Sequence, residues 1–299
     1  MRNAVRVALA PVSAMVWGYD KIADWLVEFL AQKFSNTPPD RIIQPPLMIA
    51  GPTIEALRFA GDTELRDLYA TLLSTSMDRE RSQYAHPSFV EVLKQLTPDE
   101  AKLMEYLRTR GMWAMPAVTV LRTIGEEPHR ATAEALKHFS MMPTLAKCQY
   151  PERFVTYVEN LRRLALADIS PSTLAQEHFA DIRSHPDFLY ATTKQAGVAV
   201  EIREEVLHLT DYGTQFVLAC MGELVKSMHA HCPGCNELIY FDVRTEFLHR
   251  DAKTIRAALQ RATCSRCKKT VAEILEGRRL DRPRGKNSKP SRAKRKPKS

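Results

Sequence analysis

Apolar residues recur at three- and four-residue intervals through much of the chain, which predicts amphipathic helices around a shared core. The first such segment begins after the capping residue Asp20 and runs to about Phe34. Its polar face carries both acids and bases, so we expect it to pack into the core and not on a membrane surface. The same periodicity predicts helices over three further segments: Thr53–Ser76 with a break at Gly61–Thr63, Ser88–Leu96, and Glu152–Ala167.

The segment Thr97–Glu100 has the composition of a helix start. Thr97 is a capping residue, Pro98 suits the first helical position, and Glu100 can complete a capping box. We expect the helix that begins here to end at Gly111, because glycine is favoured just past a helix C-terminus.

Strand-like alternation is found in two places. For Ala117–Leu121, periodicity does not decide between a strand and a helix start. Between Val198 and Leu209, alternation on both sides of a charged turn at Arg203–Glu205 predicts a β-hairpin, and Thr210 or Asp211 would cap a last helix. Helices followed by a hairpin and a helix match a winged-helix module with a long insertion. The predicted fold is therefore mainly α with a small β component, a helical body containing a winged-helix-like region.

Four cysteines near the C-terminus have the spacing of a metal site. Cys232 and Cys235 form one C-x-x-C pair, and 28 residues separate it from a second pair, Cys264 and Cys267. Each such turn places two sulfurs on one edge of a tetrahedron, so the two pairs predict one structural Zn²⁺ in a zinc-ribbon-like module. Iron, two disulfides, and reduced cysteines without metal are the alternatives. The expected elements of this module are strands over Leu238–Val243 and Lys269–Ile274 and a helix within Thr245–Arg261.

The net charge of +8 is concentrated at the C-terminus. Residues Arg278 to Ser299 carry eleven Lys and Arg against one acid, which leaves −2 for the rest of the chain. This segment has almost no large apolar side chains and is predicted to be disordered, as an arm for nucleic acid or as a solubilising tail. The predicted nucleic-acid-binding residues are Arg278, Arg279, Arg282, Arg284, Lys286, Lys289, Arg292, Lys294, Arg295, Lys296 and Lys298. Near the cysteines, Arg261, Arg266, Lys268 and Lys269 offset the negative charge of four zinc-bound thiolates.

Signs of catalysis are sparse. The sequence contains no P-loop, H-E-x-x-H, G-x-S-x-G or dinucleotide-binding motif. The polar segment from Asp78 to His86 offers an acid and a histidine at close spacing, and these two are the catalytic candidates. The alternative is a solvated loop between helices. The acidic residues of the predicted wing would repel phosphate, so we expect that region to contact protein rather than DNA.

Several segments together resemble the Abi-alpha (abortive infection) family over roughly Ala4 to Glu223. They are Pro46–Pro52 (PLMIAGP), Glu64–Leu73 (ELRDLYATLL), Ser76–Asp78 (SMD), His86–Phe89 (HPSF), Leu96–Glu100 (LTPDE), Asn160–Leu164 (NLRRL) and Leu209–Phe216 (LTDYGTQF), followed by Cys220. The resemblance implies a bacterial protein linked to defence against phage. It supplies no catalytic residues, and the zinc module and basic tail lie beyond it.

The expected organisation is an N-terminal helical segment at 1–45, an Abi-alpha-like domain at 46–228, a zinc-ribbon-like module at 229–276 and a disordered basic tail at 277–299. We expect a cytoplasmic protein without a signal peptide or membrane span. Its predicted role is non-enzymatic binding or sensing in phage defence, with nucleic acid, a ribonucleoprotein or a protein as partner. A nuclease acting through Asp78 and His86 and a winged-helix transcriptional regulator are the alternatives.

Overall fold

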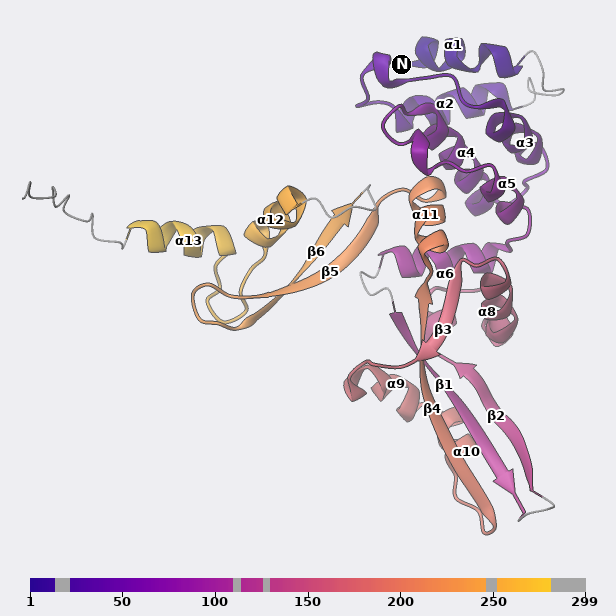
Figure 1. The fold of residues 1–299 in the computed structure, drawn as a ribbon, viewed down its shortest axis with the longest axis vertical. Helices are drawn as coiled ribbons and strands as arrows, with labels where there is room; N and C mark the ends of the chain where they lie inside the picture. Colours follow the sequence, from indigo (N-terminus) through magenta and orange to yellow (C-terminus); the bar gives the residue numbers. More distant parts are fainter. Residues whose placement is uncertain (14–21, 110–113, 126–129, 246–251, 281–299) are drawn as a thin grey trace, which may run out of the picture. The chain divides into compact units, whose positions relative to one another are not determined.

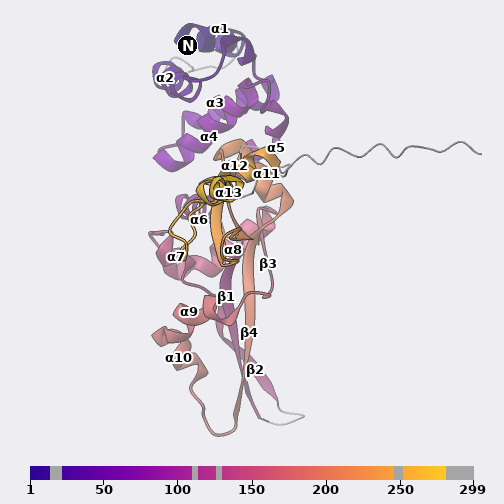
Figure 2. The ribbon, with the colours of Figure 1, turned by 90° about the vertical axis from the view of Figure 1, so that its left-hand side faces the viewer.

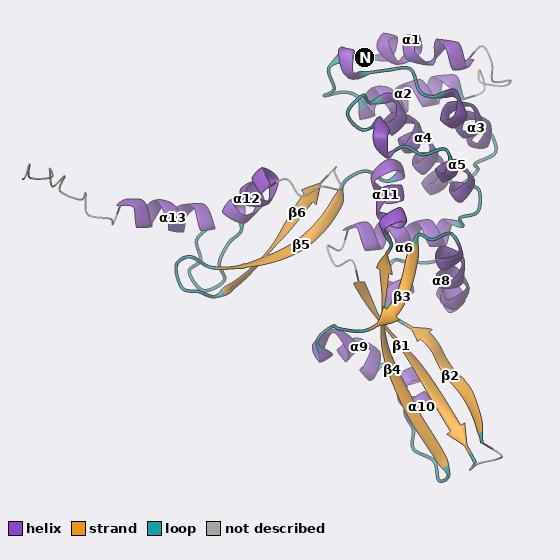
Figure 3. Ribbon diagram, in the orientation of Figure 1, coloured by secondary structure: helices purple, strands orange, loops and turns teal. Residues whose placement is uncertain are grey.

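The computed structural model describes residues 1–13, 22–109, 114–125, 130–245 and 252–280, which form two compact units. The first unit takes in residues 1–227 and the described residues of 242–250, and the second takes in residues 228–241 and the described residues after 251. Figure 1 labels the elements of both units, and Figure 3 separates their helices from their strands.

The first unit is built on a helical layer whose apolar faces share one core. At its centre is α4 (Thr63–Met77), which is buried at every position from Leu68 onward. Around α4 pack the helices α2 (Ala23–Lys33), α3 (Leu47–Leu57), α5 (Ser88–Leu93), α6 (Pro98–Thr109) and α11 (Asp211–Cys220), and α1 (Arg2–Ser13) packs on α2 and α3. The helices predicted from periodicity are confirmed, although α3 begins at Leu47 rather than Thr53.

The predicted capping box at the start of α6 is confirmed. The Thr97 backbone N–H donates to Glu100 Oε2 at 2.7 Å, and the Glu100 N–H donates to Thr97 Oγ1 at 3.3 Å. Thr210 caps α11 in the predicted manner, because its hydroxyl accepts from the Gly213 N–H at 2.8 Å. Asp20 and Gly111, the other predicted end signals, lie outside the described residues.

A four-stranded antiparallel sheet extends from the helical layer. Its strands are β1 (Ala114–Ile124), β2 (Ala131–Phe139), β3 (Ala167–Pro171) and β4 (Val198–Leu209), in the order β2-β1-β4-β3. One end of the sheet joins the helical core through Leu207 and Leu209. The segment Ala117–Leu121, left open between strand and helix, lies within β1.

The predicted hairpin was wrong. Arg203, Glu204 and Glu205 form no turn, because they continue β4 and pair with Thr119, Val118 and Ala117 of β1. Their charges are compatible with a strand, because each has a partner: Arg203 pairs with Glu201 at 2.7 Å, Glu204 pairs with Arg183, and Glu205 lies 2.7 Å from His138 Nδ1. The winged-helix-like region depended on that hairpin as its wing, so the sheet does not support it.

Short helices flank the sheet. Helices α9 (Ala180–Ser184) and α10 (Pro186–Thr192) cover one face, where Phe179, Ile182 and Phe188 pack against Val118 and Val120. Figure 2 shows these two helices together on that side of the strands. The remaining helices of the unit are α7 (Met142–Leu145) and α8 (Phe154–Arg163), the latter within the predicted Glu152–Ala167 segment.

The second unit contains two helices and the part of a hairpin that lies within residues 228–241. Strands β5 (Leu224–His231) and β6 (Leu238–Thr245) pair with each other, and α12 (Ala252–Arg261) and α13 (Val271–Leu280) follow. The predicted strand near Leu238 and helix before Arg261 are confirmed. The predicted strand over Lys269–Ile274 was wrong, because Thr270 and Glu273 form a capping box that starts α13.

The described helices include none with the length and apolarity needed to cross a membrane. The predicted domain boundary at 228/229 falls inside β5 and stays a prediction. The segment predicted to be separate at 1–45 contributes Val5, Leu9 and Leu26 to the core of the helical layer.

Candidate metal centre

The two C-x-x-C turns, the first and second knuckles, are built alike. In the first knuckle, Cys232–Glu237, the Cys232 N–H donates to Glu237 O at 2.7 Å and the Asn236 N–H to Cys232 O at 2.9 Å. In the second knuckle, Cys264–Lys269, the equivalent bonds join Cys264 to Lys269 at 3.0 Å and Lys268 to Cys264 at 2.9 Å. Each turn folds back so that both of its sulfurs lie on one side.

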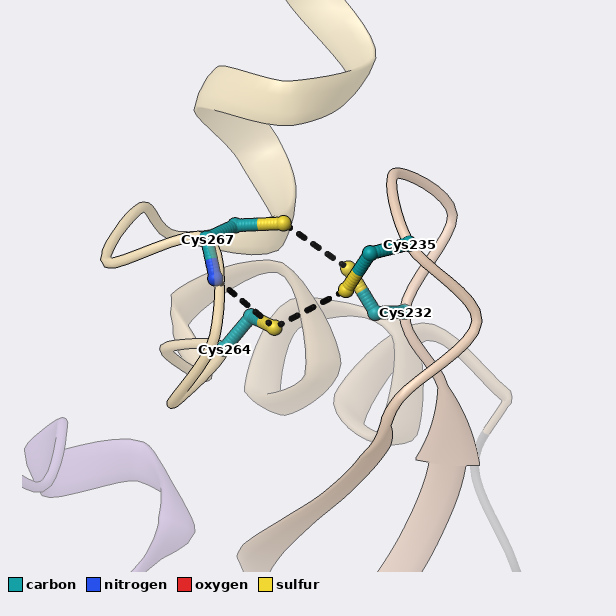
Figure 4. Close-up of side chains that lie close together, drawn as sticks. All are labelled: Cys232, Cys235, Cys264 and Cys267. Carbon is teal, nitrogen blue, oxygen red and sulfur yellow. Dashed lines mark hydrogen bonds between the residues drawn. The ribbon is translucent and has the colours of Figure 1, made fainter.

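The knuckles bring their sulfurs into one cluster (Figure 4). All four Sγ atoms lie within 4.8 Å of one another. Cys232 Sγ is 3.8 Å from Cys267 Sγ, and Cys235 Sγ is 3.6 Å from Cys264 Sγ. Four sulfurs at about 2.3 Å from a zinc ion would be about 3.8 Å apart. The separations therefore match a shared tetrahedral ion, and they are far longer than the ~2.05 Å of a disulfide.

Apolar side chains surround the sulfurs. Cys264 is fully buried and Cys232 is 3 % exposed, in a cluster with Ile239 from β6 and Val271 from α13. Gly234 lies directly over the site, because a Cβ there would be 3.1 Å from Ile274 Cγ2 and 3.3 Å from Cys267 Sγ. A larger residue at this position would require Ile274 or Cys267 to move by a few tenths of an ångström.

Proximity perturbs the thiols. Burial alone would raise the pKa of Cys232, but the N–H groups of Cys235 and Gly234 favour its thiolate and lower that pKa to about 7. The neighbouring sulfur of Cys235, aided by burial, raises the pKa of Cys267 to about 12. Four thiolates this close repel one another, so only a cation among them allows all four to ionise.

Asp78 and His86 have structural partners in the structure. Asp78 is 6 % exposed and forms a two-oxygen ion pair with Arg41, at 2.7 Å from Nη2 to Oδ2. His86 Nδ1 accepts from the Ser88 N–H at 3.1 Å and lies 2.6 Å from Ser88 Oγ, at the start of α5. Among the described residues, the cysteines alone form a group of three or more side chains placed to share a metal ion.

The predicted tail residues divide between two regions. Arg278 and Arg279 lie in the last turn of α13. The others, from Arg282 to Lys298, lie outside the described residues, so the predicted disorder of the tail stays a prediction.

A cleft of about 670 Å³ in the helical layer was not predicted. Its lining includes cations and anions in similar numbers, among them Lys33, Asp67, Lys102, Glu105 and Lys147. These side chains come from helices far apart in sequence, and no local pattern could have placed them together. The mixed charge selects no class of ligand.

The family model described as "Abortive infection alpha" matches residues 18–220. The cysteine knuckles lie beyond the matched stretch. A solved structure of an uncharacterized protein from the hydrocarbon-degrading marine bacterium Alcanivorax borkumensis SK2 is similar at 17% identity, with a TM-score of 0.29, over 48% of this chain and 96% of that chain. No curated protein matches the chain.

Proposed function

Because the chain belongs to the Abortive infection alpha family, we propose that it is a bacterial phage-defence protein that works by binding rather than by catalysis. The family match is the observation that carries the defence role. The helical layer is the sensing or partner-binding part. The second unit and the basic tail attach this part to nucleic acid or a ribonucleoprotein.

The non-enzymatic role is supported by how Asp78 and His86 are held. Asp78 is committed to Arg41, and His86 to the start of α5. A metal-dependent nuclease needs acids that are free to share an ion. Acid and histidine ligands in such a group are absent from the described residues.

A phage-plaque assay with the variant Asp78→Asn/His86→Ala tests this role. Asparagine keeps a hydrogen-bond acceptor for Arg41, whereas alanine would remove every bond that Arg41 Nε and Nη2 make to this position. We expect protection equal to that of the wild type. Loss of protection by a folded variant would instead favour the nuclease.

We further propose that the cysteine cluster holds one Zn²⁺ in a structural role. Four protein thiolates fill a tetrahedron and leave no position for a substrate or water, which is typical of structural zinc. The sulfur separations of 3.6 and 3.8 Å support this assignment. Elemental analysis of the purified chain should find about one zinc per molecule.

Cys264→Ser should abolish metal retention, because it removes the most deeply buried ligand. Cys148→Ser is the matched control, since Cys148 lies outside the cluster. If elemental analysis finds iron and no zinc, the four-cysteine site would stand, and its metal would be iron. Full metal content in Cys264→Ser would refute the site.

The basic tail is proposed to bind phosphates without sequence preference. Its residues carry +10 between 278 and 299, which suits a polyanion. If about five cations contact phosphates, log affinity should fall with log salt at a slope near −4 to −5. Binding that is absent or insensitive to salt would leave the tail as a solubilising segment.

A further inference from the structure

The two knuckles share a backbone but present different surfaces. The first knuckle carries Pro233, Gly234, Asn236 and Glu237 between and after its cysteines, whereas the second carries Ser265, Arg266, Lys268 and Lys269. Both make the same backbone hydrogen bonds. Since the first knuckle forms without any cation, the turn itself does not require the three cations of the second.

Lys268 occupies a backbone conformation that lysine disfavours. Its φ is 57°, in the left-handed region, and the equivalent Asn236 in the first knuckle has a φ of 64°. Asparagine tolerates this region because its short polar side chain can bond locally, whereas for other side chains it costs about 1–2 kcal/mol. Asparagine would relieve this backbone strain, so the presence of lysine at position 268 points to a function of its side chain.

Five cations of the second unit are exposed to solvent. Arg256 and Arg261 on α12 and Arg266, Lys268 and Lys269 on the second knuckle are all exposed. None of these five forms an ion pair with a carboxylate of the described residues. A zinc ion with four thiolates would carry −2, so the five cations would still leave +3 beyond what the metal centre neutralises (5 − 2 = 3).

We propose that the second knuckle, with Lys268 at its tip, and the cations of α12 form an ordered phosphate-binding surface for nucleic acid. This inference rests on the proposed function and deepens it, because it adds a folded contact to the tail. An anionic membrane fits less well. The apolar side of α12 packs into the cysteine cluster through Leu259, and Leu275, 40 % exposed, is the large apolar side chain that the described part of this unit exposes.

The test uses the full-length, metal-loaded chain and the variant Lys268→Asn. A labelled single-stranded RNA and a DNA duplex, both of random sequence, serve as probes in fluorescence anisotropy over a salt series. Losing one phosphate contact should reduce the slope of log affinity against log salt by about 0.7–0.9. Because asparagine suits the left-handed conformation, the thermal unfolding midpoint should stay equal or rise.

Lys194→Asn, which removes an exposed lysine of the first unit, is the matched control and should leave the slope unchanged. If Lys268→Asn is unstable, Arg266→Gln/Lys269→Gln takes its place, with an expected slope change of about twice that size. If these variants keep the wild-type slope and removal of residues 281–299 abolishes binding, the second knuckle does not bind phosphate. The proposed role of the tail would then stand. Binding to vesicles that contain anionic lipid, without binding to the RNA or the DNA probe, would contradict nucleic-acid binding by the knuckle and by the tail.

Discussion

The carboxylate of Asp99 holds a distant loop against the start of α6. Asp99 is 4 % exposed and accepts the N–H groups of Gln149 at 2.8 Å and Tyr150 at 2.9 Å and the hydroxyl of Tyr157 at 3.0 Å. We predict that Asp99→Ala lowers the free energy of unfolding by about 2–3 kcal/mol, because these donors lose their acceptor inside the protein. Urea denaturation measures the loss.

Asp187 provides the control for this prediction. It also follows a proline at the start of a helix, α10, but its side chain is 65 % exposed. Asp187→Ala should change the free energy of unfolding by no more than about 0.5 kcal/mol. Equal losses in the two variants would mean that an acid in the first turn of a helix, and not the buried contacts, stabilises the fold.

The same carboxylate predicts a pH dependence. Burial alone would raise the pKa of Asp99, but the N–H groups of Gln149 and Tyr150 outweigh it and hold that pKa below its ordinary value of 3.8. A group whose pKa is lower in the folded state stabilises the fold above its unfolded pKa, and this contribution is lost as pH falls through the folded pKa. The stability difference between wild type and Asp99→Asn should therefore be constant above about pH 5 and shrink below about pH 4. If this difference in the free energy of unfolding stays the same below about pH 4, the predicted role of the Asp99 charge would be contradicted.

Among the elements, those specified by neighbouring residues were the ones predicted. The capping box of Thr97 and Glu100 and the apolar stripe of α4 are local signals, and both were read correctly. Strand β2 was missed because its residues are exposed over most of its length and show no alternation of burial. Its conformation depends on pairing with β1, which no local pattern reports.

Two errors had signals in the sequence. The capping box of Thr270 and Glu273 marks the start of α13, where a strand was expected. The charged residues Arg203–Glu205 were taken for a turn, although they contain none of the glycine, proline or asparagine that tight turns favour. Both errors arose from weighing hydrophobic alternation above the chemistry of ends and turns.

The continuous β4 strand predicts that proline is not tolerated at Arg203. Backbone groups of Arg203 face Thr119 of β1, because Glu204 O bonds on the opposite side to the Ser172 N–H at 2.9 Å. Arg203→Pro should lower the free energy of unfolding by at least about 2 kcal/mol, although its side chain is exposed. Arg203→Thr, which keeps the N–H, should be nearly neutral. If Arg203→Pro unfolds at the same temperature as the wild type, the result would favour a turn at Arg203–Glu205, as in the predicted hairpin.

At the scale of the whole molecule, spacing alone identified the cysteine cluster, because two C-x-x-C pairs restrict the geometry whatever lies between them. The structure forms two compact units, a division that depends on contacts across the chain. That division implies separate sources of stability. The first unit has an extensive apolar core, whereas the core cluster found among the described residues of the second is the small one around its sulfurs.

Removal of the metal should therefore unfold one unit and spare the other. Structural zinc contributes about 10–16 kcal/mol of apparent binding free energy in small modules, far more than the apolar cluster around Ile239 and Val271 can replace. After treatment with a strong chelator, we expect proteases to cleave beyond about residue 228 while the first unit stays resistant. Adding Zn²⁺ back should restore resistance, and Cys264→Ser should be cleaved with or without it. A chelated second unit that resists proteolysis as well as the untreated chain would mean that packing, and not a cation, holds the two knuckles together.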